Sequence, residues 1–138
     1  MAIDLDSIKT RVEALGLFTS VQGVANASEA LENGARPPAA FVAVSSERAA
    51  PNKTQGVHDQ RVDATIAVLM CLAAQRADNR RADVAEDTRL AVIPQLAGWT
   101  PTGARLPFDY DSYRVIRMGG GLIWLECSFR TSWVLRVP

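Results

Sequence analysis

Residues 57–72 read VHDQRVDATIAVLMCL, an unbroken strand pattern in a chain of 138 residues. Strands in globular proteins average about five or six residues, so this one is unusually long. About fifteen extended residues span roughly 50 Å at about 3.3 Å each. A single domain of this length is too small to cover such a strand alone, and we therefore expect part of the strand to pair with another chain.

A second strand signal comes earlier, at residues 38–45 with the sequence PAAFVAVS. Residues 46–56 between the two signals read SERAAPNKTQG, with turn formers and charges of both signs but no catalytic cluster. Two strands joined by a polar loop form one extended feature that reaches away from a small domain. This pattern favours assembly over catalysis.

The charge balance limits the classes of partner. Lysine and arginine together number 15, as do aspartate and glutamate. A neutral chain has no global field to attract nucleic acid or an anionic membrane, although a local patch can still bind phosphate. No apolar run approaches the roughly 20 residues that cross a bilayer, and the acidic N-terminus is unlike a signal peptide. We expect one domain, residues 1–138, that works in the cytoplasm or in something assembled there.

Two cysteines, Cys71 and Cys127, lie among apolar neighbours in predicted strands. Free cysteines behave as small buried hydrophobic residues, and we favour this state over a disulfide, which remains geometrically possible between adjacent strands. One histidine and no CxxC spacing argue against a zinc site.

The rest of the chain predicts helices and strands around the long strand. Asp83 followed by Glu86 indicates a capping box at the start of a second helix, and Pro94 should kink or tighten the last turn of that helix. The expected elements are helix 5–15, strand 18–23, helical turns 28–34, strands 38–45 and 57–72, helix 83–97, loop 99–112, and a hairpin of strands 113–118 and 122–137 turned by glycines 119–121.

The last strand alternates between apolar and polar residues, so it has one face toward a core and one toward water or a partner. The expected core residues are Ile8, Val12, Ile66, Val68, Leu125, Phe129 and Trp133. The fold class that follows is α+β, with a mostly antiparallel or mixed sheet of about four to five strands and helices packed on one face. The long strand or hairpin would extend from this domain for subunit contacts.

No group of residues matches a known catalytic pattern. His58 and Asp59 suggest acid–base chemistry, but no nucleophile is placed to use it. The glycines at 119–121 precede a strand rather than the helix that a phosphate loop needs. Asp109 and Asp111 have the oxygens for a divalent cation, although two acids in a loop are common. We therefore expect no catalytic, cofactor or metal site.

Several segments resemble the tail terminator proteins of long-tailed bacteriophages and prophages. These are PAAFV at 38–42 with SERAAPN at 46–52, QRV at 60–62, LAGWTP at 96–101, and GLIW at 121–124 before an alternating strand. The resemblance covers most of the chain from about residue 38 onward, together with the N-terminal helix. Pro94 departs from the pattern.

The resemblance implies a structural protein without enzymatic activity. Such proteins form a ring, usually a hexamer, that caps the head-proximal end of the tail tube, stops its polymerisation and offers a surface to the head–tail connector protein. The implied partners are further copies of this chain, the tail tube protein and the connector, with DNA only passing through the lumen and no membrane. The location implied is the virion tail, assembled in the bacterial host cytoplasm.

We expect the subunit or tail-tube interface to use charged and polar residues of the long strand and its loop, the polar connection at residues 76–81, and the last strand. The candidates are Glu47, Arg48, Asn52, Lys53, Arg61, Asp63, Arg76, Arg80, Arg81, Glu126 and Arg130. Two alternatives remain open: another tail or neck component, such as a tube or completion protein, and a small ligand-binding or enzymatic domain with a pocket near Asp109, Asp111 and Tyr113.

Overall fold

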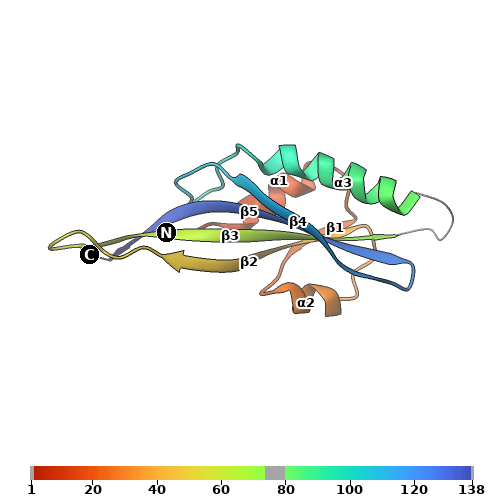
Figure 1. The fold of residues 1–138 in the computed structure, drawn as a ribbon, viewed down its shortest axis with the longest axis horizontal. Helices are drawn as coiled ribbons and strands as arrows, with labels where there is room; N and C mark the ends of the chain where they lie inside the picture. The colour runs from red at the N-terminus through yellow and green to blue at the C-terminus, as the bar shows by residue number, and fades with distance from the viewer. Residues whose placement is uncertain (1, 74–79, 138) are drawn as a thin grey trace.

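The computed structural model describes the backbone of residues 2–73 and 80–137, and the side chains of these residues except 80–82. The strands in this part of the chain are β1 (Ser20–Gly23), β2 (Ala39–Ala49), β3 (His58–Ala73), β4 (Asp109–Gly119) and β5 (Leu122–Val137). They form one sheet in the order β1-β2-β3-β5-β4 (Figure 1). β1 runs parallel to β2, and the other neighbouring strands are antiparallel.

The described helices are α1 (Leu5–Glu13), α2 (Ala27–Glu32) and α3 (Arg80–Leu96). α1 and α3 cover one side of the sheet, the helix face, whereas α2 lies on the other side, the open face (Figure 1). The α+β class with a mixed sheet is therefore confirmed. One short helix in addition covers part of the second face. None of the described helices is long and apolar enough to span a membrane.

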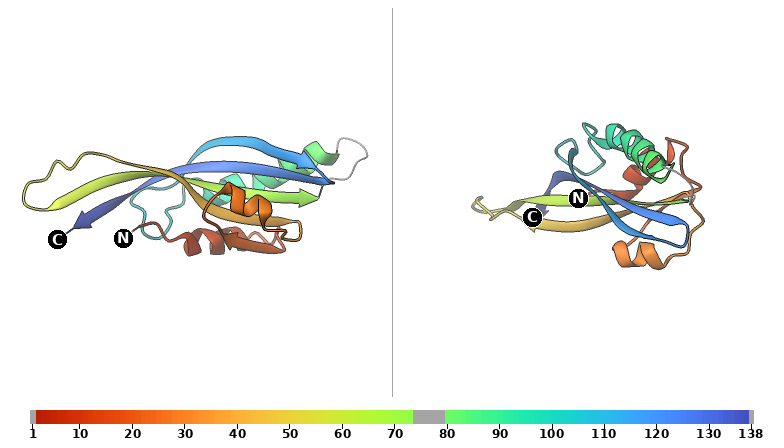
Figure 2. Two further views of the ribbon diagram at one scale, coloured as in Figure 1. Left: turned by 90° about the horizontal axis from the view of Figure 1, so that it is seen from below. Right: turned by 45° about the vertical axis from the view of Figure 1, so that its right-hand side comes forward.

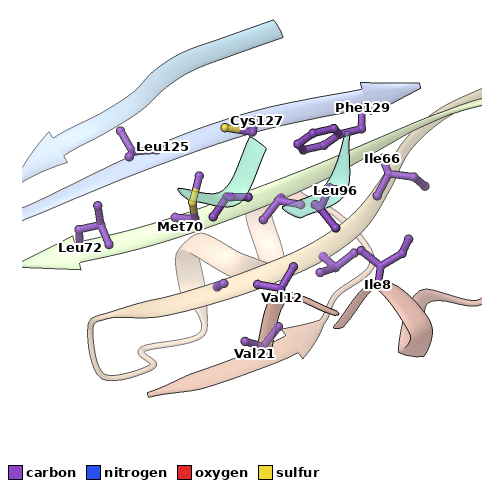
Figure 3. Packing of buried hydrophobic residues seen from close by; sticks show 14 of the residues in the cluster. Ile8, Val12, Val21, Ile66, Met70, Leu72, Leu96, Leu125, Cys127 and Phe129 are labelled. Atoms are coloured by element: carbon purple, nitrogen blue, oxygen red, sulfur yellow. The ribbon is translucent and has the colours of Figure 1, made fainter. Parts of the chain in front are cut away.

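The main core lies between the helix face and helices α1 and α3 (Figure 3). The pairing of β3 with β5 places Ile66 opposite Phe129, and both side chains are fully buried. All the expected core residues are buried except Trp133, which is half-buried. A smaller cluster on the open face packs Phe41 on Trp124 beneath α2, with the ring centroids 5.8 Å apart. Period-two alternation therefore assigned the faces of the long strands correctly.

Hydrogen bonds join α1 to α3, and others cap the N-terminal ends of α1 and α2. The Arg11 Nε of α1 donates to the Gln95 carbonyl of α3, and the Gln95 side-chain amide donates to the Arg11 carbonyl, both at 2.9 Å. The Asp4 side chain accepts from the Asp6 amide and caps α1. At α2, Asn26 accepts from the Glu29 amide while the Glu29 side chain accepts from the Ala25 amide. Reciprocal capping of this kind satisfies amides that a helix start leaves free.

The start of α3 differs from the sequence prediction. The helix begins at Arg80, so Asp83 lies in its first turn and the predicted capping box at Asp83 and Glu86 is wrong. Acidic residues are stabilising in the first turn of a helix because of the helix dipole. An acidic residue in the first turn is therefore easily mistaken for one at the capping position. Pro94 is accommodated inside α3, two residues before the helix ends at Leu96.

β4 begins at Asp109, four residues earlier than expected, so the loop predicted at 99–112 ends sooner. Asp109 and Asp111 flank Tyr110, and acidic residues of this kind usually indicate a loop. They fit a strand here because β4 is the edge of the sheet and most of its residues are exposed. The turn from β4 to β5 uses Gly119, Gly120 and Gly121, all with positive φ, a conformation that favours glycine.

Candidate functional site

The most distinctive surface is an arm that extends beyond the helices. We define the arm as residues 46–63, from β2 and β3 and their connection, together with residues 132–137 of β5. It projects from one end of the molecule as a narrow ribbon (Figure 2). Three strands pair at its base, where β2 ends at Ala49, and from His58 to Arg61 β3 pairs with β5 alone. β5 pairs with β3 along its whole length, so that His58 lies opposite Val137 at the end of the arm. The long strand is therefore paired on both edges by its own chain from Val62 to Cys71, and the expectation that part of it pairs with another chain is not met over these residues. β2 and β5 form the outside of the arm.

Part of the loop predicted at residues 46–56 belongs to a strand. β2 continues to Ala49 after a register shift between Val44 and Ser46, and the connection is confined to residues 50–57. A bulge of this kind bends a strand and raises its twist. The bulge also reverses the alternation, so Glu47 lies on the helix face and Arg48 on the open face. No signal in the sequence predicts this shift, because serine at 45 and 46 fits either face.

The tip of the arm holds Asn52 and Lys53, both exposed. The Asn52 side-chain oxygen accepts from the amides of Thr54 and Asp59, at 3.3 and 3.1 Å. The Gln60 side chain donates to the Ala50 carbonyl at 2.9 Å. Asn52 thus organises the connection from within the chain, whereas Lys53 forms no ion pair among the described residues.

The open face of the arm and of its junction with the body brings together four of the predicted site residues. Cross-strand register places Arg48 opposite Asp63, and Thr65 opposite Arg130. Arg61 lies on the same face and pairs with Asp63 at 3.2 Å, while Arg130 pairs with Asp111 at 3.2 Å. Exposed ion pairs contribute about 0–1 kcal/mol each. These side chains are therefore available to a partner at little cost to the fold.

Arg48, Arg130, Asp63 and Asp109 also border a depression of about 300 Å³ where the arm meets the body. Its floor has small hydroxyl residues, Ser46, Thr65 and Ser132. Leu106 closes one side, because its carbonyl accepts from the Thr131 hydroxyl at 2.6 Å. Sequence reasoning missed this hollow, because Ser46 joins Thr65 and Ser132 on the open face only after the bulge in β2. Two cationic and two anionic groups make it suited to protein surfaces of mixed charge.

Two predicted site residues have internal roles. Glu126 lies on the expected face, but its side chain is only 11% exposed and forms an ion pair with Arg114 at 2.9 Å. Glu126 is therefore not an exposed charge, since residues of α2 and β4 lie around it, and its place in an interface stays a prediction. Glu47 accepts from the Trp133 indole nitrogen at 3.1 Å across the helix face of the arm.

The basic group in the connection to α3 is only partly described. Arg76 lies outside the described residues, and the side chains of Arg80 and Arg81 are likewise outside them. The backbone places Arg80 and Arg81 at the start of α3, at the opposite end of the molecule from the arm tip (Figure 1). The predicted site residues therefore do not form a single cluster.

The alternative site near Asp109, Asp111 and Tyr113 would need these side chains on one face, but Asp109 and Tyr113 lie on opposite faces of the sheet. Asp109 lies opposite Arg130 on the open face, whereas Tyr113 lies opposite Cys127 on the helix face, beneath the Arg89 guanidinium at 4.3 Å. Burial raises the pKa of Tyr113 and raises the pKa of the Cys127 thiol to about 11. Cys127 is thus a neutral core residue at physiological pH rather than a nucleophile.

The described residues also do not form an acid–base site, a metal site or a disulfide. The only histidine in the sequence, His58, contacts Gln60 near the arm tip. No three His, Cys, Asp or Glu residues among those described are placed to hold a metal ion. Cys71 and Cys127 are both free and buried, on opposite faces of the sheet.

Comparison with solved structures gives a match across nearly the whole chain. A chain in the virion of a native gene transfer agent particle has the same fold, with a TM-score of 0.52 and 15% sequence identity. The match covers 94% of this chain and 93% of the other. No curated protein sequence matches. The sequence profile of phage tail terminator proteins matches residues 1–137, and the chain therefore belongs to the phage tail terminator family, whose members are structural proteins of the tail.

Proposed function

We propose that this protein forms a hexameric ring that caps the head-proximal end of the tail tube. In this role the ring stops tube polymerisation and presents its other side to the head–tail connector. The observation that carries the proposal is the three-stranded arm of a chain that belongs to the tail terminator family. An arm that projects beyond the hydrophobic core gains nothing for a monomer, because most of its residues are exposed.

The arm also suits a closed ring. A contact between different patches of identical chains closes into a ring when the rotation between copies allows it, and otherwise produces a filament. The arm and the body are two such different patches. A terminator requires the closed form, because an open contact would extend the tube rather than end it.

The charges of the open face fit recognition of other proteins. Arg48, Arg61, Asp63 and Arg130 present both signs within one surface, and complementary charges contribute specificity and association rate more than affinity. A neutral molecule with mixed patches also does not hold DNA strongly, as a ring through which DNA passes requires. The ring would act in the virion tail after assembly in the host cytoplasm.

The test uses purified protein and headless tail tubes. Electron microscopy of the mixture should show added density at one end of each tube, and mass measurement should give a closed oligomer rather than a growing polymer. Long mixed polymers of this chain would instead indicate a tube component. A protein that stays monomeric and leaves tube ends bare would contradict the proposal.

A further inference from the structure

Apart from one hydrogen bond at Ser132, the two outer edges of the arm have no backbone partner among the described residues. β1 covers β2 only as far as Val42, whose carbonyl accepts from the Val24 amide. β4 covers β5 only as far as Arg130, and the Arg105 amide adds one bond to the Ser132 carbonyl. Beyond these points β2 and β5 each pair with β3 alone. Exposed edges of this kind are templates for pairing with another chain.

Backbone hydrogen bonds show which residues direct their polar groups outward. Successive residues of a strand point their amide and carbonyl groups to alternate sides. Ala50 donates to the Arg61 carbonyl and so faces β3, which turns Glu47 and Ala49 outward. Ser132 faces away from β3 because it accepts from Arg105. By the same alternation, Val134 and Arg136 also direct their backbone polar groups away from β3.

β2 and β5 are both antiparallel to β3, so the two edges run in the same direction. In a cyclic ring, the β5 edge of one copy can therefore meet the β2 edge of the next copy as parallel strands. A hollow of about 490 Å³ opens beside the β5 edge, between Val134 and Arg136 on one side and residues 103–105 on the other.

We propose that neighbouring copies join by pairing the β2 edge of one arm with the β5 edge of the next. The inference rests on the proposed ring and specifies its contact. At the base of the arm, where β2 still pairs with β3 up to Ala49, three strands from each of six copies would form a barrel of about eighteen strands. Barrels of that size leave an aqueous channel. The helix face is occupied by α1 and α3, so the open face, with Arg48 and Arg61, would line the channel.

The other sheet edges are poorer candidates. β1 has four residues and offers little length. β4 has eleven residues but contains two register shifts, at Tyr110/Ser112 and Val115/Arg117. Bulges twist an edge away from a would-be partner and are a common protection against pairing. On the proposed edges, no register shift interrupts the pairing of β5 with β3, and the single shift in β2, between Val44 and Ser46, precedes the outward residues Glu47 and Ala49.

The first test places proline on an edge. Val134→Pro removes an outward amide without breaking a bond to β3, a position where sheets tolerate proline. Val115→Pro is the matched control on β4. Val115 lies opposite Leu125, whose backbone polar groups face β3, so the backbone amide of Val115 also points outward from the sheet. We expect Val134→Pro to weaken each contact about tenfold and to abolish rings at concentrations where wild type and Val115→Pro form them.

The second test is cross-linking and does not depend on tolerance of proline. If the two edges pair as parallel strands, side chains of the open face become neighbours across the contact. Arg48 of one copy then lies beside Val134 of the next, or beside Arg136 if the register is shifted by two residues. The double variants Arg48→Cys with Val134→Cys and Arg48→Cys with Arg136→Cys should therefore include one that gives an oxidised ladder ending at six copies. The corresponding single variants, which lack a partner thiol across the edge, should not give this ladder.

The outcomes separate the contact from the ring. Wild-type rings together with unaffected Val134→Pro rings and no cross-linked ladder would overturn the edge pairing and leave the proposed function standing. Loss of rings in Val115→Pro alone would move the contact to β4. Absence of wild-type rings, in solution and on tail tubes, would overturn both proposals.

Discussion

Phe129 illustrates how far single residues follow from the sequence. Its position in an alternating strand predicts the helix face, and the structure buries it fully beside Phe108, at 5.6 Å between ring centroids. The burial of Glu126 on the opposite face was not predictable in this way. It depends on α2, which is distant in sequence and meets Glu126 only in the folded chain, whereas the hairpin alone places Arg114 opposite Glu126.

Phe129→Ala should lower the free energy of unfolding by roughly 3–5 kcal/mol, through lost burial and the cavity left behind. Arg130→Ala is the neighbouring control on the exposed face, and its effect should stay below about 1 kcal/mol. Urea unfolding measures both. A loss of less than about 1 kcal/mol for Phe129→Ala would mean that the face of β5 is assigned wrongly.

Cys127 should make the protein sensitive to alkaline pH. The native thiol holds its proton up to a pKa of about 11, against a reference value of 9.0, because burial disfavours the thiolate. Below about pH 9 both states are protonated and this group has no effect. Between about 9 and 11 only the unfolded state loses the proton, so the free energy of unfolding should fall.

Cys127→Ala should reduce this alkaline decline, while any contribution from tyrosines remains equal in both proteins. Urea unfolding at pH 8 and pH 10.5 provides the comparison. Identical declines in the two proteins would show that the thiol is not held neutral by the native structure.

Among the secondary structure elements, the long strands were predicted well and the irregular positions were not. β3 and β5 lie within one residue of their expected ranges, because sixteen residues of strand pattern leave little ambiguity. The bulge after Val44 and the early start of β4 were missed. Both depend on pairing with a neighbouring strand, which local propensity does not encode.

The charges of the arm's open face give a prediction for this element. Arg61→Glu with Arg130→Glu should leave the monomer folded, because both side chains are exposed and their ion pairs are weak. The double variant should nevertheless impair ring closure or tube capping. Lys9→Glu with Arg36→Glu makes the same change of net charge away from the arm and serves as the control.

Circular dichroism confirms folding in this experiment, and particle mass and tube-end occupancy measure function. Normal rings and normal capping by the arm variant would remove the open face from the mechanism. The tip of the arm would then be the remaining candidate.

Shortening the tip tests that candidate. Deleting residues 51–55 removes Asn52 and Lys53 but keeps the paired strands, so unfolding should change little. If the tip contacts a neighbouring copy, the deletion should yield a folded monomer that no longer closes rings at concentrations where wild type does. Rings of normal mass from the deletion would assign the contact to the strands alone.

For the whole molecule, the sequence predicted the fold class and the family but not the arrangement of the site. The terminator resemblance rested on structural segments, and the family match to residues 1–137 confirms it. Most of the predicted interface residues that the structure describes lie on the arm or beside it, whereas Glu126 is buried under α2 and Arg80 and Arg81 begin α3. The division arises because sequence spacing does not reveal which ends of a sheet carry which loops.

Tail length tests the proposed function most directly. Electron microscopy would compare tails from particles produced with and without an intact copy of this chain. We predict tails of one defined length when the chain is present. In its absence, tubes should continue beyond that length and lack heads, and supplying the wild-type chain should restore the defined length. Tails of normal, uniform length that carry heads in the absence of the chain would contradict a role in ending the tube.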